Sequence, residues 1–185
     1  MIANLLRGER IHLTSFSSGD VSTIVQWEED ALFLRLSAAE PALPRTAQAI
    51  ENWLNDVDKR STEIMFAVRL RSTNELIGLA GIDGILWSSQ VGGIFVAFGS
   101  RTNWGQGYGF EALQLLLTYA FTELNLYRLQ ATIFSYNTRS IAMVKKCGFK
   151  QEGVFRHFIQ RDGQRYDMFL FGLLYPEWKH ISDRP

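Results

Sequence analysis

Hydrophobic and polar residues alternate in several short runs of the chain, and this two-residue period predicts β-strands. In the first run, for example, Ile11 and Leu13 alternate with polar neighbours. The predicted strands cover residues 5–14, 64–70, 76–86, 92–99, 128–134, 152–160 and 166–174. Residues 71–75 and the pair Asp162-Gly163 are typical turn sequences, so we expect a hairpin at each of them.

Other segments repeat their apolar residues every three or four positions, which is typical of a helix with one buried face. The longest runs from Phe110 to Leu124. Shorter helices are predicted from Asp20 to about Trp27, after Thr46 through Val57, and over 138–146. Two prolines within 38–44 indicate a loop. Because the strands and helices are interleaved, we expect a mixed α/β fold.

The composition narrows the class of protein further. The chain has 185 residues, enough for one domain with a substantial core, and we expect residues 1–185 to form a single domain. Lys+Arg and Asp+Glu each total 19, so bulk charge favours neither nucleic acid nor an anionic membrane. The single cysteine, Cys147, excludes an internal disulfide framework. The first residues lack the pattern of a secretion signal, and no apolar run approaches the ~18 residues of a membrane span. We therefore expect a cytoplasmic location.

The segment from Trp104 to Phe110 has glycines at three alternate positions, directly before the longest predicted helix. Glycine lets the main chain approach a ligand closely, and the first amides of a helix favour an anion such as phosphate. Neither Lys nor Ser/Thr follows Gly109, so the segment is not a Walker loop. The spacing also differs from the Gly-x-Gly-x-x-Gly of dinucleotide folds. A glycine-rich turn without a ligand remains the alternative.

The order strand, glycine loop, helix, strand, Asn137, helix and Gly148-Phe149 resembles the GNAT superfamily of acetyl-CoA-dependent N-acetyltransferases. The family motif Gln/Arg-x-x-Gly-x-Gly/Ala aligns with Trp104-x-x-Gly107-x-Gly109. A Trp in the first position departs from the general motif and resembles the sequence of the branch that contains the ribosomal-protein N-terminal alanine acetyltransferases. Weaker matches follow along nearly the whole chain: Leu5 to Leu13, Asn137-x-x-Ser140, Lys146 to Phe149, Glu152-Gly153, Asp162-Gly163 with Asp167, and Glu177-Trp178. The resemblance implies a central, mostly antiparallel twisted sheet that splays at the cofactor strand and is flanked by helices.

The resemblance also implies acetyl-CoA as co-substrate and a set of residues that bind it. The glycine loop would hold the pyrophosphate, and the end of the preceding strand would pair with the pantetheine amides. Asn137 would contact the pantetheine arm, although it is also a preferred residue to cap a helix that begins at Thr138. The implied cofactor-binding residues are Ala97, Phe98, Gly99, Trp104, Gln106, Gly107, Tyr108, Gly109, Phe110 and Asn137.

The residues for proton transfer depart from the family pattern. Many relatives carry a Tyr proton donor where this chain has Val144, and some carry a Glu where it has Gly92-Gly93. We assign Asp83 and Ser140 as the catalytic candidates. Ser140 would hydrogen-bond near the thiolate or be an ordinary first-turn residue. Further candidates for the acid and base are Glu111, His157 and Tyr166, and each of them and Asp83 has a purely structural alternative.

The missing base bears on the acceptor. Lysine has a pKa of about 10.4 and an α-amine about 7.7–8.0, so deprotonating lysine costs about 3.4 kcal/mol more at neutral pH. We therefore expect a protein N-terminal α-amine, on a ribosomal or another protein. One alternative is a small amine, a polyamine or an aminoglycoside, held by an acidic N-terminal region: Asp20, Glu28, Glu29, Asp30 and Glu40. The other is a CoA-binding module without catalysis.

Further expectations concern metals, cysteine chemistry and assembly. The histidines lack metal-ligand spacing, so no metal site is predicted. Cys147 stands beside Gly148 at the end of a short helix, which favours a buried thiol over a nucleophile. We expect no direct binding to nucleic acid or membrane. The chain would act as a monomer or a homodimer.

Overall fold

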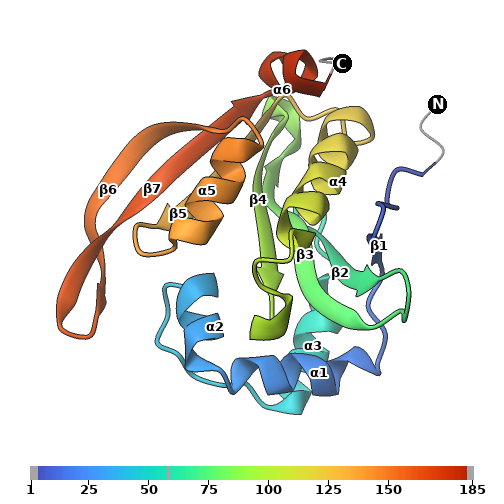
Figure 1. The fold of residues 1–185 in the computed structure, drawn as a ribbon, viewed down its shortest axis with the longest axis vertical. Helices are drawn as coiled ribbons and strands as arrows, with labels where there is room; N and C mark the ends of the chain where they lie inside the picture. Colours follow the sequence, from blue (N-terminus) through green and yellow to red (C-terminus); the bar gives the residue numbers. More distant parts are fainter. Residues whose placement is uncertain (1–3, 58, 183–185) are drawn as a thin grey trace.

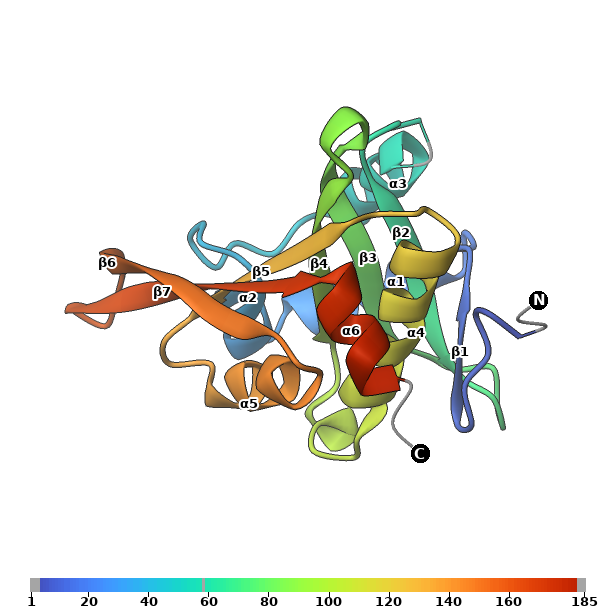
Figure 2. The ribbon, with the colours of Figure 1, turned by 90° about the horizontal axis from the view of Figure 1, so that it is seen from above.

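The computed structural model describes residues 4–57 and 59–182 and has a seven-stranded sheet with helices on both faces (Figures 1 and 2). The strands are β1 (Ile11–Thr14), β2 (Ile64–Leu70), β3 (Leu76–Leu86), β4 (Val91–Phe98), β5 (Arg128–Phe134), β6 (Lys150–Arg161) and β7 (Gln164–Leu174). The helices are α1 (Asp20–Glu28), α2 (Ala31–Ser37), α3 (Ala47–Val57), α4 (Tyr108–Thr122), α5 (Thr138–Lys146) and α6 (Tyr175–Ser182). Two short 3₁₀ turns flank β4: η1 (Trp87–Ser89) and η2 (Arg101–Asn103).

The strand order is β1-β2-β3-β4-β5-β7-β6, and β4–β5 is the parallel pair among otherwise antiparallel neighbours. Parallel strands need a long crossover, and α4 supplies it. β4 and β5 pair only from Val91 to Gly93 and from Arg128 to Gln130. The rest of β4 keeps its partner β3 but leaves β5. The mixed α/β class and the mostly antiparallel sheet are therefore confirmed, and the sheet splays at β4.

Alternate residues of β4 contribute to two separate cores, one on each face of the sheet. Ile94, with Val96 and Phe98, packs with the residues of α4 and α5 in the larger core. Phe95 and Ala97 pack in a smaller core that residues of α1, α2 and α3 complete. We call the side of the sheet with the larger core the α4 face and the side with the smaller core the α1 face.

Most predicted elements are confirmed, with shifts of one or two residues at the ends, but the first strand is shorter than 5–14. Only Ile11–Thr14 is strand, because the amide of Gly8 donates to the Ile11 carbonyl at 2.9 Å and turns the chain back on itself. A carbon added at Gly8 would lie 2.3 Å from a Glu111 oxygen, so this turn packs tightly against α4.

Helices α2 and α6 were not predicted. Helix α2 spans only seven residues, and its N-cap is Asp30, whose side chain accepts from the Leu32 amide at 2.9 Å. Helix α6 follows β7 without a loop, and its second residue is Pro176, which is tolerated in a first helical turn. The apolar run of β7 therefore hides the boundary between them. No helix within the described residues is long and apolar enough to cross a membrane.

Candidate active site

The glycine loop forms the start of α4, as the sequence indicated. Gly107 is the N-cap residue with φ +84°, and Gly105 has φ +74°, both in the left-handed region that side chains resist. A carbon added at Gly109 would come within 3.0 Å of the Met143 sulfur on α5. The loop therefore needs these glycines both for its backbone angles and for its close approach to α5. The first amides of α4 are consequently available to an anion.

Two side chains from distant parts of the chain fix the outside of this loop. Arg10 donates to the Gln106 carbonyl at 2.8 Å and lies over the Tyr108 ring, 5.0 Å from its centroid. Glu111 accepts from the Arg10 amide at 2.8 Å and pairs with the Arg10 guanidinium at 3.1 Å. Glu111 thus holds the segment before β1 against α4, and this geometry favours the structural alternative for Glu111 over an acid–base role.

Trp104 closes the loop onto the end of β4. Its indole N–H donates to the Phe98 carbonyl at 2.7 Å, and Arg139 of α5 lies 5.4 Å from its ring centroid. The Phe98 carbonyl therefore already has a hydrogen-bond partner within the protein. Trp104 acts here as a brace between loop and strand, a contact that the motif alone does not reveal.

The edge of β4 fits the pantetheine arm of the expected co-substrate. From Ile94 to Phe98 this edge has no strand partner on the β5 side, so the main-chain groups of the alternate residues that point to it can pair with amides of a ligand, except for the Phe98 carbonyl that Trp104 occupies. Gly99 follows, and a carbon added there would lie 1.9 Å from the Trp27 ring. Main chain, rather than side chains, would hold acetyl-CoA along Ala97, Phe98, Gly99 and the glycine loop, and the bound thioester would supply the activated acetyl group.

Asn137 caps α5, as one of its two predicted roles requires. Its Oδ1 accepts from the Ser140 amide at 3.2 Å. The Nδ2 group is a separate donor, so the cap does not exclude a contact with pantetheine. Val144 is 3 % exposed in the larger core, which agrees with its inability to act as an acid. Ser140 lies in the first turn of the same helix, and its hydroxyl role stays a prediction.

Asp83 lies beside Gly93 on the α1 face. The two residues are partners in the β3–β4 register, and a carbon added at Gly93 would lie 2.1 Å from the Asp83 Oδ1. Partial burial raises the pKa of the Asp83 carboxyl above its usual value, and the charge of nearby Glu63 raises it further. Asp83 nevertheless keeps access to solvent. The Asp83 carboxylate thus lies next to Gly93, in the part of β4 where some relatives carry a Glu and this chain does not.

His157 and Tyr166 have partners on the β6–β7 hairpin. The amide of His157 donates to Asp167 at 2.8 Å, and the Tyr166 hydroxyl donates to Gln164 at 3.2 Å. The Tyr166 ring also packs edge-on against Tyr136, with centroids 5.1 Å apart. The contacts of the Tyr166 side chain favour its structural alternative, and the role of the His157 imidazole stays a prediction.

Sequence reasoning missed the contacts that join the β6–β7 hairpin to α2 and its following loop. Tyr136 donates to the Arg35 carbonyl at 2.7 Å, and Arg35 pairs with Asp162 in the hairpin turn at 2.6 Å. Arg161 donates to the carbonyls of Ala39 and Glu40 at 3.0 and 2.9 Å. No motif marks such contacts, because they join residues that are about 100 or more positions apart.

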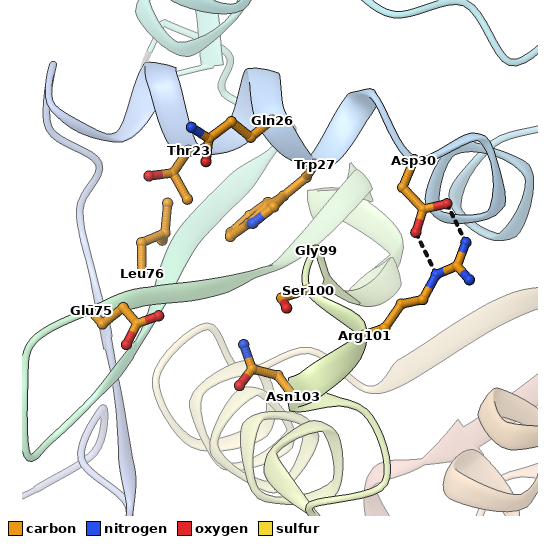
Figure 3. Close-up of a pocket in the computed structure, with 10 residues that line it drawn as sticks. All are labelled: Thr23, Gln26, Trp27, Asp30, Glu75, Leu76, Gly99, Ser100, Arg101 and Asn103. Atoms are coloured by element: carbon orange, nitrogen blue, oxygen red, sulfur yellow. Dashed lines mark hydrogen bonds and ion pairs between the residues drawn. The ribbon is translucent and has the colours of Figure 1, made fainter.

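A pocket of about 510 Å³ lies where α1 approaches the end of β4 (Figure 3). Gln26 and Thr23 line it from α1, Glu75 from the turn before β3, and Asn103 from η2. Arg101 closes one side through two 2.7 Å hydrogen bonds to Asp30. The pocket therefore adjoins the predicted cofactor residue Gly99 from the α1 face.

Cys147 and possible metal ligands add little to this site. Burial raises the pKa of the Cys147 thiol from 9.0 to about 12, so the thiol stays protonated at neutral pH and is a poor nucleophile. Within residues 4–57 and 59–182, no group of three or more His, Cys, Asp or Glu side chains could hold a metal ion. The candidate site consists of the glycine loop, the open edge of β4 and the polar residues near it.

A parallel strand pair that separates beside a glycine-capped helix is the arrangement of an acyl-CoA-binding transferase. The family model described as "Acetyltransferase (GNAT) domain" matches residues 10–150. The chain belongs to this family and is an N-acetyltransferase that uses acetyl-CoA.

Individual relatives agree with this assignment. The uncharacterized N-acetyltransferase p20 of Bacillus licheniformis is 29% identical over 171 residues, which are 92% of this chain and 96% of that protein. The [ribosomal protein uS5]-alanine N-acetyltransferase of Escherichia coli is 26% identical over 136 residues, 73% of this chain and 70% of that protein. The spermidine N-acetyltransferase of Vibrio cholerae, solved with CoA and spermine, has the same fold, with a TM-score of 0.84 at 19% identity over 93% of this chain and 99% of that one.

Proposed function

We propose that this N-acetyltransferase transfers the acetyl group of acetyl-CoA to the α-amine of a protein N-terminus. The proposal rests on one observation: most of the acidic residues on the α1 face are already in ion pairs with arginines. A polyamine carries several positive charges, so a site for it needs several carboxylates that are free to face them. Arginines already neutralise most of the carboxylates that the sequence offered for that purpose.

Two of these carboxylates are buried in ion pairs. Asp20 is 4 % exposed and pairs with Arg69 at 2.6 Å. Glu28 is 2 % exposed and accepts hydrogen bonds from the Arg45 side chain and from the Arg45 amide, the latter at 2.8 Å. A buried, paired carboxylate stabilises the N-terminal helices and has little to offer a soluble cation.

A third carboxylate, Asp30, is held by both nitrogens of the Arg101 fork. The Arg101 guanidinium lowers the pKa of the Asp30 carboxyl, so the pair stays ionised and neutral overall near pH 7. Of the five acidic residues, this leaves Glu29 and Glu40 outside the ion pairs described here. Two exposed carboxylates make a weak site for a polycation.

The proton chemistry favours the same acceptor. An α-amine is partly neutral at pH 7, and a lysine amine is almost fully protonated. The acceptor of the Escherichia coli relative, by its name, is an alanine of ribosomal protein uS5, which is consistent with an α-amine. The Vibrio cholerae structure, by its title, belongs to a spermidine enzyme, but it supports only the shared fold.

The test is a rate comparison with purified protein and acetyl-CoA. The panel contains hexapeptides with free N-terminal Ala, Ser or Met, the same peptides with a blocked N-terminus and one internal lysine, and spermidine. We expect kcat/KM for the best free N-terminus to exceed the values for the other two classes by at least about tenfold. A preference for spermidine or for the blocked lysine peptides would refute the proposed acceptor.

A further inference from the structure

The Asp83 side chain fills the space that a side chain at Gly93 would need. A side chain at Gly93 would have its first carbon 2.1 Å from the Asp83 Oδ1, closer than any two such atoms can lie. The Asp83 carboxylate therefore occupies the position that a side chain on β4 would take. It reaches this position from β3, as the direct register partner of Gly93.

This position is the point at which the sheet opens. Gly93 is the last β4 residue that pairs with β5, and its partner there is Gln130. A carbon added at Gly92 would meet Ile82 and Leu126 of the larger core, so Gly93 and Asp83 face the opposite side, the α1 face. The carboxylate consequently lies at the closed end of the opening, across the sheet from the core that α4 joins.

Amide formation needs a group that takes a proton from the attacking nitrogen. The amine nitrogen bonds to the acetyl carbon, the carbon–sulfur bond breaks with its electron pair on sulfur, and nitrogen must lose a proton. We propose that the Asp83 carboxylate accepts this proton, while the departing thiolate takes one from water. The proposal rests on acetyl transfer to an amine as the function but on no particular amine.

The groups that face Asp83 suit this role. Glu63 approaches from the segment before β2, and its own carboxylate is paired with Arg60 at 2.7 Å. Gln130 on β5 adds a neutral amide on the same face. Burial and the Glu63 charge both raise the pKa of Asp83, which makes it a stronger base than an ordinary aspartate. No arginine or lysine contact neutralises it among the interactions of the described residues.

The first test replaces the base without changing its shape. Asp83→Asn should lower kcat/KM by about 10²–10⁴-fold, the usual contribution of a general base. The acceptor is whichever amine of the panel the wild type acetylates fastest, so peptide preference and the role of Asp83 are judged separately. Asp56→Asn removes an exposed carboxylate on α3 and should leave kcat/KM unchanged. Full activity in Asp83→Asn would overturn the proposal.

The second test moves the carboxylate and leaves it in the chain. Gly93→Ala places a carbon where the Asp83 oxygen lies, and only a side-chain end must shift to accept it. We expect kcat/KM to fall at least tenfold, with the affinity for CoA, measured by calorimetry, within about twofold of wild type. Wild-type kcat/KM in Gly93→Ala would refute the link between the two positions.

A third measurement does not depend on activity. The ¹³C resonance of the Asp83 carboxyl, identified by its loss in Asp83→Asn, should titrate above the ordinary value of about 3.9. Glu63→Gln removes the neighbouring negative charge and should move that titration to lower pH. A carboxyl that titrates at the ordinary value in both proteins would contradict the proposed environment, whatever the acceptor proves to be.

Discussion

The two faces of the sheet build their parts of the site in different ways. On the α4 face, consecutive residues of one loop and one strand edge offer main-chain groups, and glycines set their geometry. On the α1 face, the polar groups are side chains from α1, the loop after α2, β3 and the hairpin, brought together only by folding. Under the proposed function, the donor of the acetyl group would thus meet backbone, and the acceptor would meet side chains.

This difference determines what each face requires of its residues. Main-chain recognition needs only that certain positions can adopt unusual angles, as at Gly107 with φ +84°. Side-chain recognition needs charge balance, because the carboxylates of Asp20 and Glu28 are buried. The α4 face should therefore fail through backbone strain, and the α1 face through lost charge pairs. Five experiments test this contrast.

The largest effect is expected at Cys147, which belongs to the core on the α4 face. With its pKa raised from 9.0 to about 12, the native thiol has roughly 10³-fold less thiolate at pH 8 than an unfolded one, and burial slows attack further. Alkylation by iodoacetamide should be at least that much slower in the native protein than in urea. Rapid modification of the native protein would mean that the α4 face contains a reactive nucleophile after all.

The Cys147 thiol should also make the stability of the protein fall as the pH rises. The pKa of the thiol is higher in the folded than in the unfolded protein. Its contribution to the free energy of unfolding is therefore complete below about pH 9 and is lost as the pH rises from there towards about 12. The urea midpoint of the wild type should therefore fall more steeply over this range than that of Cys147→Ala. Equal slopes in the two proteins would show that the thiol is not buried as described.

The next largest effect concerns a charge pair on the α1 face. Arg45→Met keeps an apolar stem beside Trp53 but leaves the buried Glu28 carboxylate without its cation. We expect a loss of about 3 kcal/mol of unfolding free energy, or roughly 10 °C in Tm, with unchanged affinity for CoA. Lys59→Met breaks an exposed pair with Asp56 and should cost less than about 1 kcal/mol. Equal losses in the two variants would contradict the argument.

A smaller effect is expected from strain in the glycine loop. Gly107→Ala puts a side chain at φ +84° and 3.1 Å from the Arg10 guanidinium, at a cost of about 1–3 kcal/mol. If the loop relaxes, its amides move, and the Kd for CoA should rise roughly tenfold. Gly163→Ala, in the hairpin turn at φ +75° with open space around it, should lose stability without losing affinity. A similar change of affinity in both would rule out a local effect.

The smallest effect is expected at the brace between loop and strand. Trp104→Phe removes the 2.7 Å hydrogen bond to the Phe98 carbonyl, worth about 1 kcal/mol, and the Kd for CoA should rise a few-fold. Trp87 is a matched control, because its indole donates to the Ser61 carbonyl at the same 2.7 Å. Trp87→Phe should leave the affinity unchanged, and an equal loss in both variants would argue against a special role for Trp104.

The contrast between the faces also decides how much the sequence could predict. The glycine loop was predictable because its residues are consecutive and each glycine has a local reason. Periodicity predicted the long strands and α4 in the same way. The seven-residue α2 was missed because its helical pattern is too short to recognise, and α6 because no turn separates it from β7.

The arrangement around Asp83 was only partly predictable. Its residue type suggested a base, but nothing in the chain order indicates that Asp83 fills the space left by Gly93, because register between strands is set by the whole sheet. The ion pairs of Asp20 and Glu28 were missed for a similar reason. Their partners lie 49 and 17 residues away, so the acidic residues looked free for an acceptor.

The contact between Arg161 and the loop after α2 depends on the backbone of the loop and not on its side chains. Arg161 donates to the carbonyls of Ala38, Ala39 and Glu40, groups that every amino acid carries. Substitutions at these three positions can therefore change the lining of the loop while the hairpin stays attached to it. Such a loop is evolvable, because its side chains can be replaced without the fold having to be rebuilt.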